Sequence, residues 1–263
     1  MIGENCRALG FNVDFAPVLD LAYKASRSVM SSRAVSDDPK QVVVYAREFL
    51  RGLSDAGVLG CGKHFPGLGE ATLDTHCELP SVDKPLRKLW DEDLVPYRSL
   101  RSELPFIMVS HAAFPAVTKN RTPASLSKKW ITDILRKKIG YRGLICSDDL
   151  EMGGVLAAAP IEEAMVGHIR AGGDLGLICH QENFILRAYE ALVRESKRDG
   201  RFALRARESA RRVLEFKKKL AARRRNPPPT SARVEKLTRQ LWEFGEEIRL
   251  ATFARIDNKK ERS

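Results

Sequence analysis

The sequence has no apolar stretch approaching the roughly 20 residues that a membrane-spanning helix needs. Its amino-terminal stretch, MIGENCRALGFNVDF, lacks the basic region followed by an apolar region that marks a secretory signal. The cysteines are odd in number and show no CxxC spacing, which argues against a disulfide framework and indicates reduced thiols; they are Cys6, Cys61, Cys77, Cys146 and Cys179. We therefore expect a cytoplasmic protein with no membrane partner.

Signatures of cofactor and metal binding are also scarce. No GxGxxG opens a helix after an apolar run, so a dinucleotide site has little support. The histidines show neither HxxxH nor HxH spacing, which disfavours a zinc site. We expect no cofactor and no metal ion.

Positive charge is concentrated in one segment. The 263 residues include 45 Lys and Arg against 34 Asp and Glu, a net charge of +11. Residues 197–225 hold thirteen bases and three acids, whereas residues 1–196 are close to neutral at −1. The basic segment suggests a polyanion partner. An apolar stripe along it instead favours a helix that packs on the body with its bases in solvent, and a nucleic-acid partner is therefore not favoured. That stripe comprises Phe202, Val213, Leu214, Phe216 and Leu220.

Short apolar runs that end in polar residues recur through the body. They cover residues 12–20, 57–64, 106–111, 143–149 and 174–180, with helical patterns at 38–57, 127–139 and 161–171. Continuous apolar runs are typical of parallel strands covered on both faces, and alternation with helices predicts βαβ units. The polar residues follow the strands, as in a (β/α)8 TIM-type barrel, although a doubly wound open sheet fits the alternation as well.

The chain divides into four predicted parts. Residues 1–196 form the barrel, residues 197–225 a basic helix, residues 226–231 a Pro-rich linker, and residues 232–263 an amphipathic helix with a tail.

Two groups of polar residues suggest ligand binding or acid–base chemistry. Lys63 and His64 end an apolar run and enter a Gly/Pro loop, where they can donate hydrogen bonds to a polar ligand. A Gly-rich turn with a solvated lysine is the alternative. Asp74 and His76 alternate on an extended backbone, so the carboxylate can orient the imidazole as a general acid/base. A surface pair is the alternative there.

A third group suggests a nucleophile. Asp148 and Asp149 end the apolar run at 143–149. A carboxylate at the mouth of a barrel can act as the nucleophile of glycosyl transfer or as a metal ligand. For Asp149, capping of the next helix is the alternative role.

Seven stretches together resemble a known family. They are NVDFAPVLDL (12–21), SRAVSDDP (32–39), CGKHFPGLGEATLDTHCELP (61–80), IMVSHAAFP (107–115), PASLS (123–127), GYRGLICSDDLEMGG (140–154) and IRAGGDLGLIC (169–179). In this order the chain resembles glycoside hydrolase family 3, and in particular its single-domain β-N-acetylhexosaminidase branch, which acts in peptidoglycan recycling. The resemblance implies a retaining, exo-acting enzyme that removes terminal β-linked N-acetylglucosamine from a small carbohydrate or muropeptide through a covalent glycosyl-aspartate.

The resemblance also implies roles for single residues. Asp148 matches the nucleophile, His76 the general acid/base, and Asp74 the residue that orients His76. The residues expected to bind or line the sugar site are Arg33, Lys63 and His64, with His111 added from its place at the end of a predicted strand.

The chain departs from the family pattern at its start. The barrel of the family begins earlier, and an Asp-Gln-Glu-Gly-Gly-Arg stretch at its third strand has no counterpart here. Five strands are predicted where about eight close a barrel, so about the first three are missing. A fragment or misassigned start and a real shortened protein are the alternatives, and the open barrel edge would accept completion by another chain. An inactive or sugar-binding remnant with a polyanion-binding helix, and a family 3 β-glucosidase, remain as alternative functions.

Overall fold

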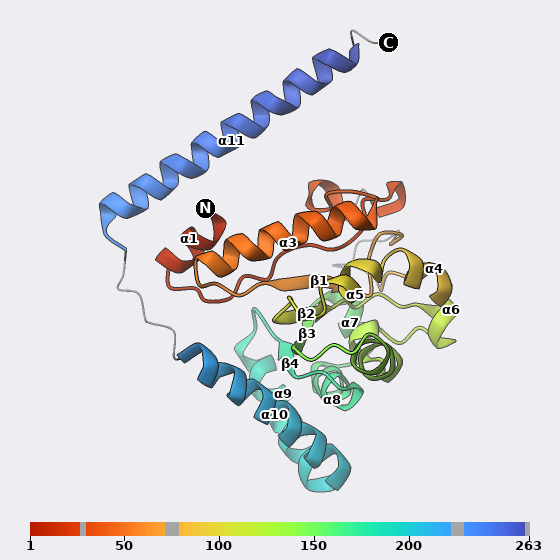
Figure 1. The fold of residues 1–263 in the computed structure, drawn as a ribbon. Helices are drawn as coiled ribbons and strands as arrows, with labels where there is room; N and C mark the ends of the chain where they lie inside the picture. The colour runs from red at the N-terminus through yellow and green to blue at the C-terminus, as the bar shows by residue number, and fades with distance from the viewer. Residues whose placement is uncertain (27–29, 72–78, 222–228, 261–263) are drawn as a thin grey trace. The chain divides into compact units, whose positions relative to one another are not determined.

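The computed structural model describes residues 1–26, 30–71, 79–221 and 229–260 (Figure 1). The chain divides into two compact units. One comprises Met1–Asp14, Gly52–Leu59 and Arg224–Ser263, and the other comprises Phe15–Arg51 and Gly60–Arg223. The second unit holds both the sheet and the basic helix, so these two parts form one body.

The second unit is built on a parallel sheet of four strands in chain order. They are β1 (Cys61–Phe65), β2 (Phe106–Val109), β3 (Leu144–Asp149) and β4 (Leu175–Leu177). β2 pairs with β3 without interruption from Phe106↔Leu144 to Val109↔Ser147. Every residue of β2 is buried, as expected of a strand covered on both faces. The predicted parallel α/β sheet is confirmed, and the fold is of the TIM-barrel type.

The first predicted strand, residues 12–20, forms no regular ladder. In the second unit the Leu19 N–H donates to the Lys63 carbonyl (2.6 Å), so this segment lies along β1. The carbonyl of Pro17 accepts the Lys63 N–H (3.2 Å), so Lys63 pairs with residues on both sides of Val18. The segment therefore runs beside β1 as an irregular strand and brings Asp20 to the end of β1.

Helices connect the strands and cover the sheet (Figure 1). They are α3 (Pro39–Asp55), α4 (Leu86–Asp91), α5 (Val95–Ser99), α6 (Pro115–Thr118), the π-type helix η4 (Lys129–Lys138), α7 (Gly153–Leu156), α8 (Ile161–Ala171), α9 (Glu182–Arg198) and α10 (Gly200–Ala221), with 3₁₀ turns at Lys24–Ser26, Ser31–Arg33 and Ala124–Leu126. The start of α3 shows why these boundaries fall where they do. The Asp38 carboxylate accepts the Lys40 N–H (2.8 Å), and Pro39 occupies the first helical position.

The core fixes the carboxyl end of β1. Phe65, the last residue of β1, packs edge-on against Tyr97 of α5 at 5.2 Å and Trp130 of η4 at 6.0 Å between ring centroids. All three side chains are fully buried. Burial of each aromatic side chain contributes about 1.5–3 kcal/mol, so the backbone next to His64 is held rigidly.

The basic helix differs from its predicted range of 197–225. Its first two bases belong to α9, and α10 begins at Gly200. Asp199 causes the break, because its carboxylate accepts the N–H groups of Arg201 (2.9 Å) and Phe202 (3.2 Å). Residues 222–225, and residues 226–228 of the predicted linker, lie outside the described residues.

The first unit contains α1 (Ile2–Ala8) and α11 (Ser231–Lys260). α11 covers most of the segment predicted as the terminal amphipathic helix, and Leu237 on it is buried. Six other large apolar side chains among those described on α11 are exposed; they are Val234, Leu241, Trp242, Phe244, Ile248 and Leu250. Within the described part of the chain, no helix combines the length and apolar character needed to cross a membrane.

Candidate active site

Two of the predicted site residues meet at the carboxyl edge of the sheet. His64 lies near the end of β1 and Asp148 near the end of β3. The imidazole Nε2 is 4.0 Å from Oδ2 of Asp148. His64 is buried, whereas the Asp148 side chain is 23% exposed. The edge where the parallel strands end thus presents one partly exposed carboxylate beside one buried imidazole.

A further carboxylate holds His64 from behind. Oδ2 of Asp20 accepts the backbone N–H of His64 (3.1 Å) and lies 2.7 Å from its Nδ1. Oδ1 of Asp20 accepts the N–H of Leu68 (2.7 Å) in the loop that follows β1. Sequence reasoning did not single out Asp20, although it ends an apolar run like the other candidates. That position was the signal that could have found it.

The strand end at β3 is ordered by its own turn. Oδ1 of Asp148 accepts the N–H of Asp149 (2.9 Å), which leaves Oδ2 facing His64. Oδ1 of Asp149 accepts the N–H of Glu151 (3.1 Å). Asp149 therefore closes the turn after β3 and does not cap α7, whose N-cap is Met152.

His111 supports the same turn. Its Nε2 lies 2.8 Å from the carbonyl oxygen of Asp149, and its Nδ1 lies 2.7 Å from Oγ of Ser125. Burial lowers the pKa of His111, so the ring is neutral at pH 7, with Nε2–H donating to the carbonyl. Both nitrogens are engaged, which favours a packing role for this histidine over direct contact with a ligand.

The described contacts do not bring the other predicted site residues to Asp148 and His64. Asp74 and His76 lie outside the described residues. Arg33 is exposed in its 3₁₀ turn, with Nη2 3.8 Å from the sulfur of Met30. Lys63 is in β1 with a half-buried side chain next to His64.

Glu151 ties the loop after β4 to the loop after β3. Its carboxylate accepts three successive backbone N–H groups, from Cys179 (2.6 Å), His180 (2.5 Å) and Gln181 (2.8 Å). Desolvation acts to raise the pKa of Glu151, but these three donors hold it below its ordinary value. Asp149, Glu151 and His180 have the ligand types for a metal ion within 4.8 Å of one another. The Glu151 oxygens already serve the backbone, so the structure gives this trio a loop-holding role.

A buried lysine organises the loop that follows His64. Nζ of Lys84 lies 2.6 Å from Asp93, 2.5 Å from Glu92 and 3.2 Å from Glu70. Burial raises the pKa of Asp93 to about 6, although Lys84 acts to lower it. A Cβ at Gly67 would lie 2.9 Å from Cβ of Asp93, so the loop needs glycine to pass this cluster.

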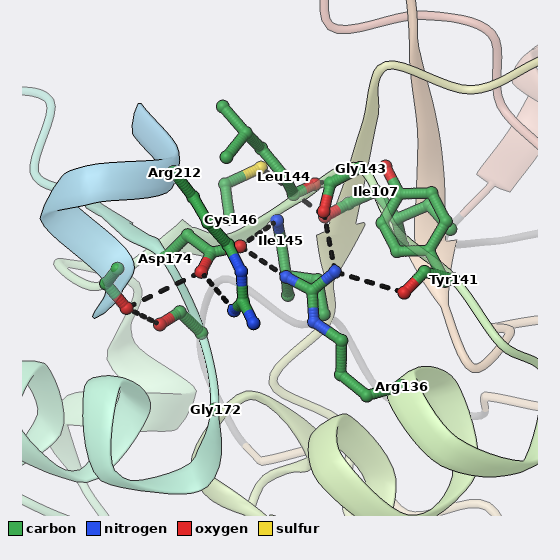
Figure 2. Close-up of polar contacts among 12 residues, drawn as sticks. Ile107, Arg136, Tyr141, Gly143, Leu144, Ile145, Cys146, Gly172, Asp174 and Arg212 are labelled. Atoms are coloured by element: carbon green, nitrogen blue, oxygen red, sulfur yellow. Dashed lines mark hydrogen bonds and ion pairs between the residues drawn. The ribbon is translucent and has the colours of Figure 1, made fainter. Parts of the chain in front are cut away.

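The opposite edge of the sheet carries a second buried carboxylate, Asp174, directly before β4 (Figure 2). Its Oδ2 accepts the N–H of Ile145 (3.0 Å) and pairs with Arg136 of η4. Its Oδ1 pairs with Arg205 (3.3 Å) and Arg212 (3.2 Å) of α10. The amino ends of the strands and the basic helix are thereby fastened together.

The basic helix was expected to pack on the body with its bases in solvent, and this arrangement corrects that expectation for two of the bases. The side chains of Arg205 and Arg212 are 18% and 31% exposed, and each also pairs with Glu208 at 2.5 Å. They are structural cations, since Asp174 is fully buried and needs their charge.

Comparison with known proteins places the chain in a family. Residues 1–216 match the family described as "Glycosyl hydrolase family 3 N terminal domain". The chain is 36% identical over 194 residues to a "Beta-hexosaminidase" of Pseudomonas aeruginosa (strain LESB58), which covers 74% of this chain and 58% of that protein. It is 37% identical over 182 residues to a "Beta-hexosaminidase" of Bordetella avium (strain 197N), covering 69% of this chain and 51% of that protein.

Solved structures point the same way. The chain is similar to a glycoside hydrolase family 3 β-N-acetylglucosaminidase from Paenibacillus sp. str. FPU-7, with a TM-score of 0.82 and 33% identity, over 88% of this chain and 44% of that one. It is also similar to the "Beta-glucoside phosphorylase BglX", with a TM-score of 0.76 and 26% identity, over 86% of this chain and 44% of that one. The chain spans a little over half the length of the curated relatives it matches.

Proposed function

Because the chain belongs to the N-terminal domain family of glycosyl hydrolase family 3, we propose that it removes terminal β-linked N-acetylglucosamine from small carbohydrates. The observation that carries the proposal is the Asp148–His64 pair at the carboxyl edge of the sheet, where the Asp148 side chain is partly exposed and its Oδ2 lies 4.0 Å from Nε2. Curated relatives named "Beta-hexosaminidase" support the choice of sugar.

The proposed reaction is a double displacement. Oδ2 of Asp148 attacks the anomeric carbon and forms a glycosyl ester, while His76 protonates the departing oxygen with Asp74 orienting its ring. Water, deprotonated by His76, then cleaves the ester and regenerates Asp148. The bonding of Oδ1 to the Asp149 N–H supports this role, because it leaves the other oxygen available for attack.

The test compares the chain with Asp148→Asn in the hydrolysis of p-nitrophenyl β-N-acetylglucosaminide. We expect turnover by the unaltered chain and a loss of at least about a thousandfold in the variant, since an amide is a poor nucleophile. Asp133→Asn, at a half-exposed carboxylate on η4, is the control. Equal turnover by Asp148→Asn, or none by the unaltered chain, would contradict the proposal.

A β-glucosidase or phosphorylase activity is the competing assignment, motivated by the likeness to the β-glucoside phosphorylase. The same preparation is assayed on p-nitrophenyl β-glucoside with and without inorganic phosphate. A higher kcat/KM on the glucoside than on the N-acetylglucosaminide would identify the chain as a β-glucosidase. A requirement for phosphate would identify it as a phosphorylase.

We further propose muropeptides as the natural substrate and the cytoplasm as the location. The free thiols of Cys6, Cys61, Cys146 and Cys179 support a reducing compartment. Release of N-acetylglucosamine from purified muropeptides and fractionation of the native protein test these two points. Membrane or exported fractions holding most of the protein would contradict the location.

A further inference from the structure

We propose that Asp20 is a positioning residue that keeps the proton of His64 on Nδ1 and so aims the other ring nitrogen, Nε2, at the ligand beside Asp148. The ligand part rests on the proposed function. The proton assignment depends only on the contacts of Asp20, so the two can fail separately.

Three N–H donors converge on the carboxylate of Asp20. The backbone N–H groups of His64 and Leu68 take one oxygen each, at 3.1 Å and 2.7 Å. Nδ1 of His64 lies 2.7 Å from the oxygen that already accepts the His64 backbone N–H. An ionised carboxylate only accepts hydrogen bonds, so Nδ1 must donate and carry a proton.

Burial makes this assignment rigid. The Asp20 side chain is fully buried and that of His64 is 6% exposed. Rotation of the ring would break the Nδ1 contact and leave a buried carboxylate with two donors in place of three. Asp20 binds the backbone N–H of His64 in β1 and that of Leu68 in the loop that follows. The ring of His64, the end of β1 and this loop are therefore held together by one carboxylate.

The consequence appears at the opposite nitrogen. Nε2 lies 4.0 Å from Oδ2 of Asp148, too far for a direct hydrogen bond. A hydroxyl group that bonds to both atoms fits this spacing, since two bonds of about 2.8 Å can share one oxygen across it. In the charged ring Nε2–H donates to that hydroxyl, and the hydroxyl donates its single proton to Oδ2 of Asp148; in the neutral ring Nε2 is an acceptor, and the hydroxyl donates to only one of the two atoms. His64 thus places a ligand hydroxyl next to the nucleophilic oxygen.

The direct test is the protonation of the ring nitrogens in the full chain. Two-bond ¹H–¹⁵N spectra of ¹⁵N-histidine-labelled protein distinguish Nδ1–H from Nε2–H, and His64→Gln identifies the His64 signals by their loss. We expect Nδ1 of His64 to carry a proton in the folded chain. An unprotonated Nδ1 in the unaltered chain would overturn the proposal without any variant.

Asp20→Asn supplies the second arm. Its side chain has one accepting oxygen and one donating NH₂, so it cannot accept three N–H groups, and an NH₂ facing Nδ1 drives the proton to Nε2. We expect the Nε2–H form to appear in the spectrum. Asp174→Asn, which removes a buried carboxylate at the opposite edge of the sheet, should leave the His64 signals unchanged. A folded Asp20→Asn chain with the unaltered tautomer would overturn the proposal.

Activity separates the two claims. On p-nitrophenyl β-N-acetylglucosaminide, Asp20→Asn should lower kcat/KM by about tenfold to a hundredfold, the value of one charge-assisted hydrogen bond, mainly through KM. If the unaltered chain shows no turnover, the proposed function fails while the nitrogen spectrum still decides the role of Asp20.

Discussion

Replacement of Asp174 by Asn should destabilise the second unit more than any surface ion pair can. Asn keeps the size of the side chain but removes the charge that faces Arg136, Arg205 and Arg212. Asp174 is fully buried, and Arg136 and Arg205 are 12% and 18% exposed, so little solvent screens the loss. Removal of one member of a buried ion pair costs about 3–5 kcal/mol. Glu208 still neutralises two of the arginines, which places the expected cost at the lower end, about 3 kcal/mol.

The measurement is urea unfolding followed by circular dichroism, with thermal unfolding in parallel. A loss of about 3 kcal/mol corresponds to a fall of roughly 6–12 °C in Tm for a chain of this size. The control is Glu162→Gln, which breaks the pair with Arg187 between side chains that are 27% and 45% exposed, and should cost at most about 1 kcal/mol. If Asp174→Asn costs no more than this control, the cluster in Figure 2 does not hold the basic helix to the sheet.

Three further outcomes follow from buried groups. Burial lowers the pKa of His168 to about 4, so between about pH 6.5 and 4 the unfolded chain binds a proton there that the folded chain does not. The free energy of unfolding should therefore fall by about 3 kcal/mol as the pH is lowered from 6.5 to 4. His168→Gln should make the free energy of unfolding less dependent on pH over this range. Gly173→Ala would put a Cβ 2.0 Å from the ring of His168 and should cost about 1–3 kcal/mol in urea, whereas Gly167→Ala on α8 has room at 3.7 Å and should not destabilise. Lys84→Met should cost about 3–5 kcal/mol at pH 7 and less at pH 5, where Asp93 takes up a proton; an unchanged difference would exclude Asp93 as the strained charge.

The strands and their polar ends were predictable because a local signal encodes them. A continuous apolar run followed by a charged residue indicated where β1 and β3 end, and the structure places His64 and Asp148 at those ends. In a parallel sheet the carboxyl ends of all strands lie at one edge, so the sequence alone could predict that His64 and Asp148 lie at the same edge.

The partners of these residues could not be predicted in the same way. Asp20 lies 44 residues before His64 in the sequence. The apolar run that Asp20 ends has the same pattern as the other runs, so the pattern does not indicate which polar residue contacts His64. The charge on α10 posed a similar problem, since composition indicates how many arginines a helix carries but not that Arg205 and Arg212 face a buried Asp174. Long-range pairing of buried charges depends on packing, which no periodicity records.

The way in which Glu151 holds the loop after β4 has a consequence for variation at the rim of the site. The three hydrogen bonds that its carboxylate accepts come from the main-chain N–H groups of Cys179, His180 and Gln181, so no side chain of these three residues takes part in those bonds. These three hydrogen bonds can therefore form with any residue at positions 179–181 except proline, which has no N–H to donate. Substitution of Gln181 therefore leaves the path of the loop unchanged, whereas substitution of His180 also removes the 3.5 Å contact of its Nε2 with Oδ2 of Asp149, the residue next to Asp148.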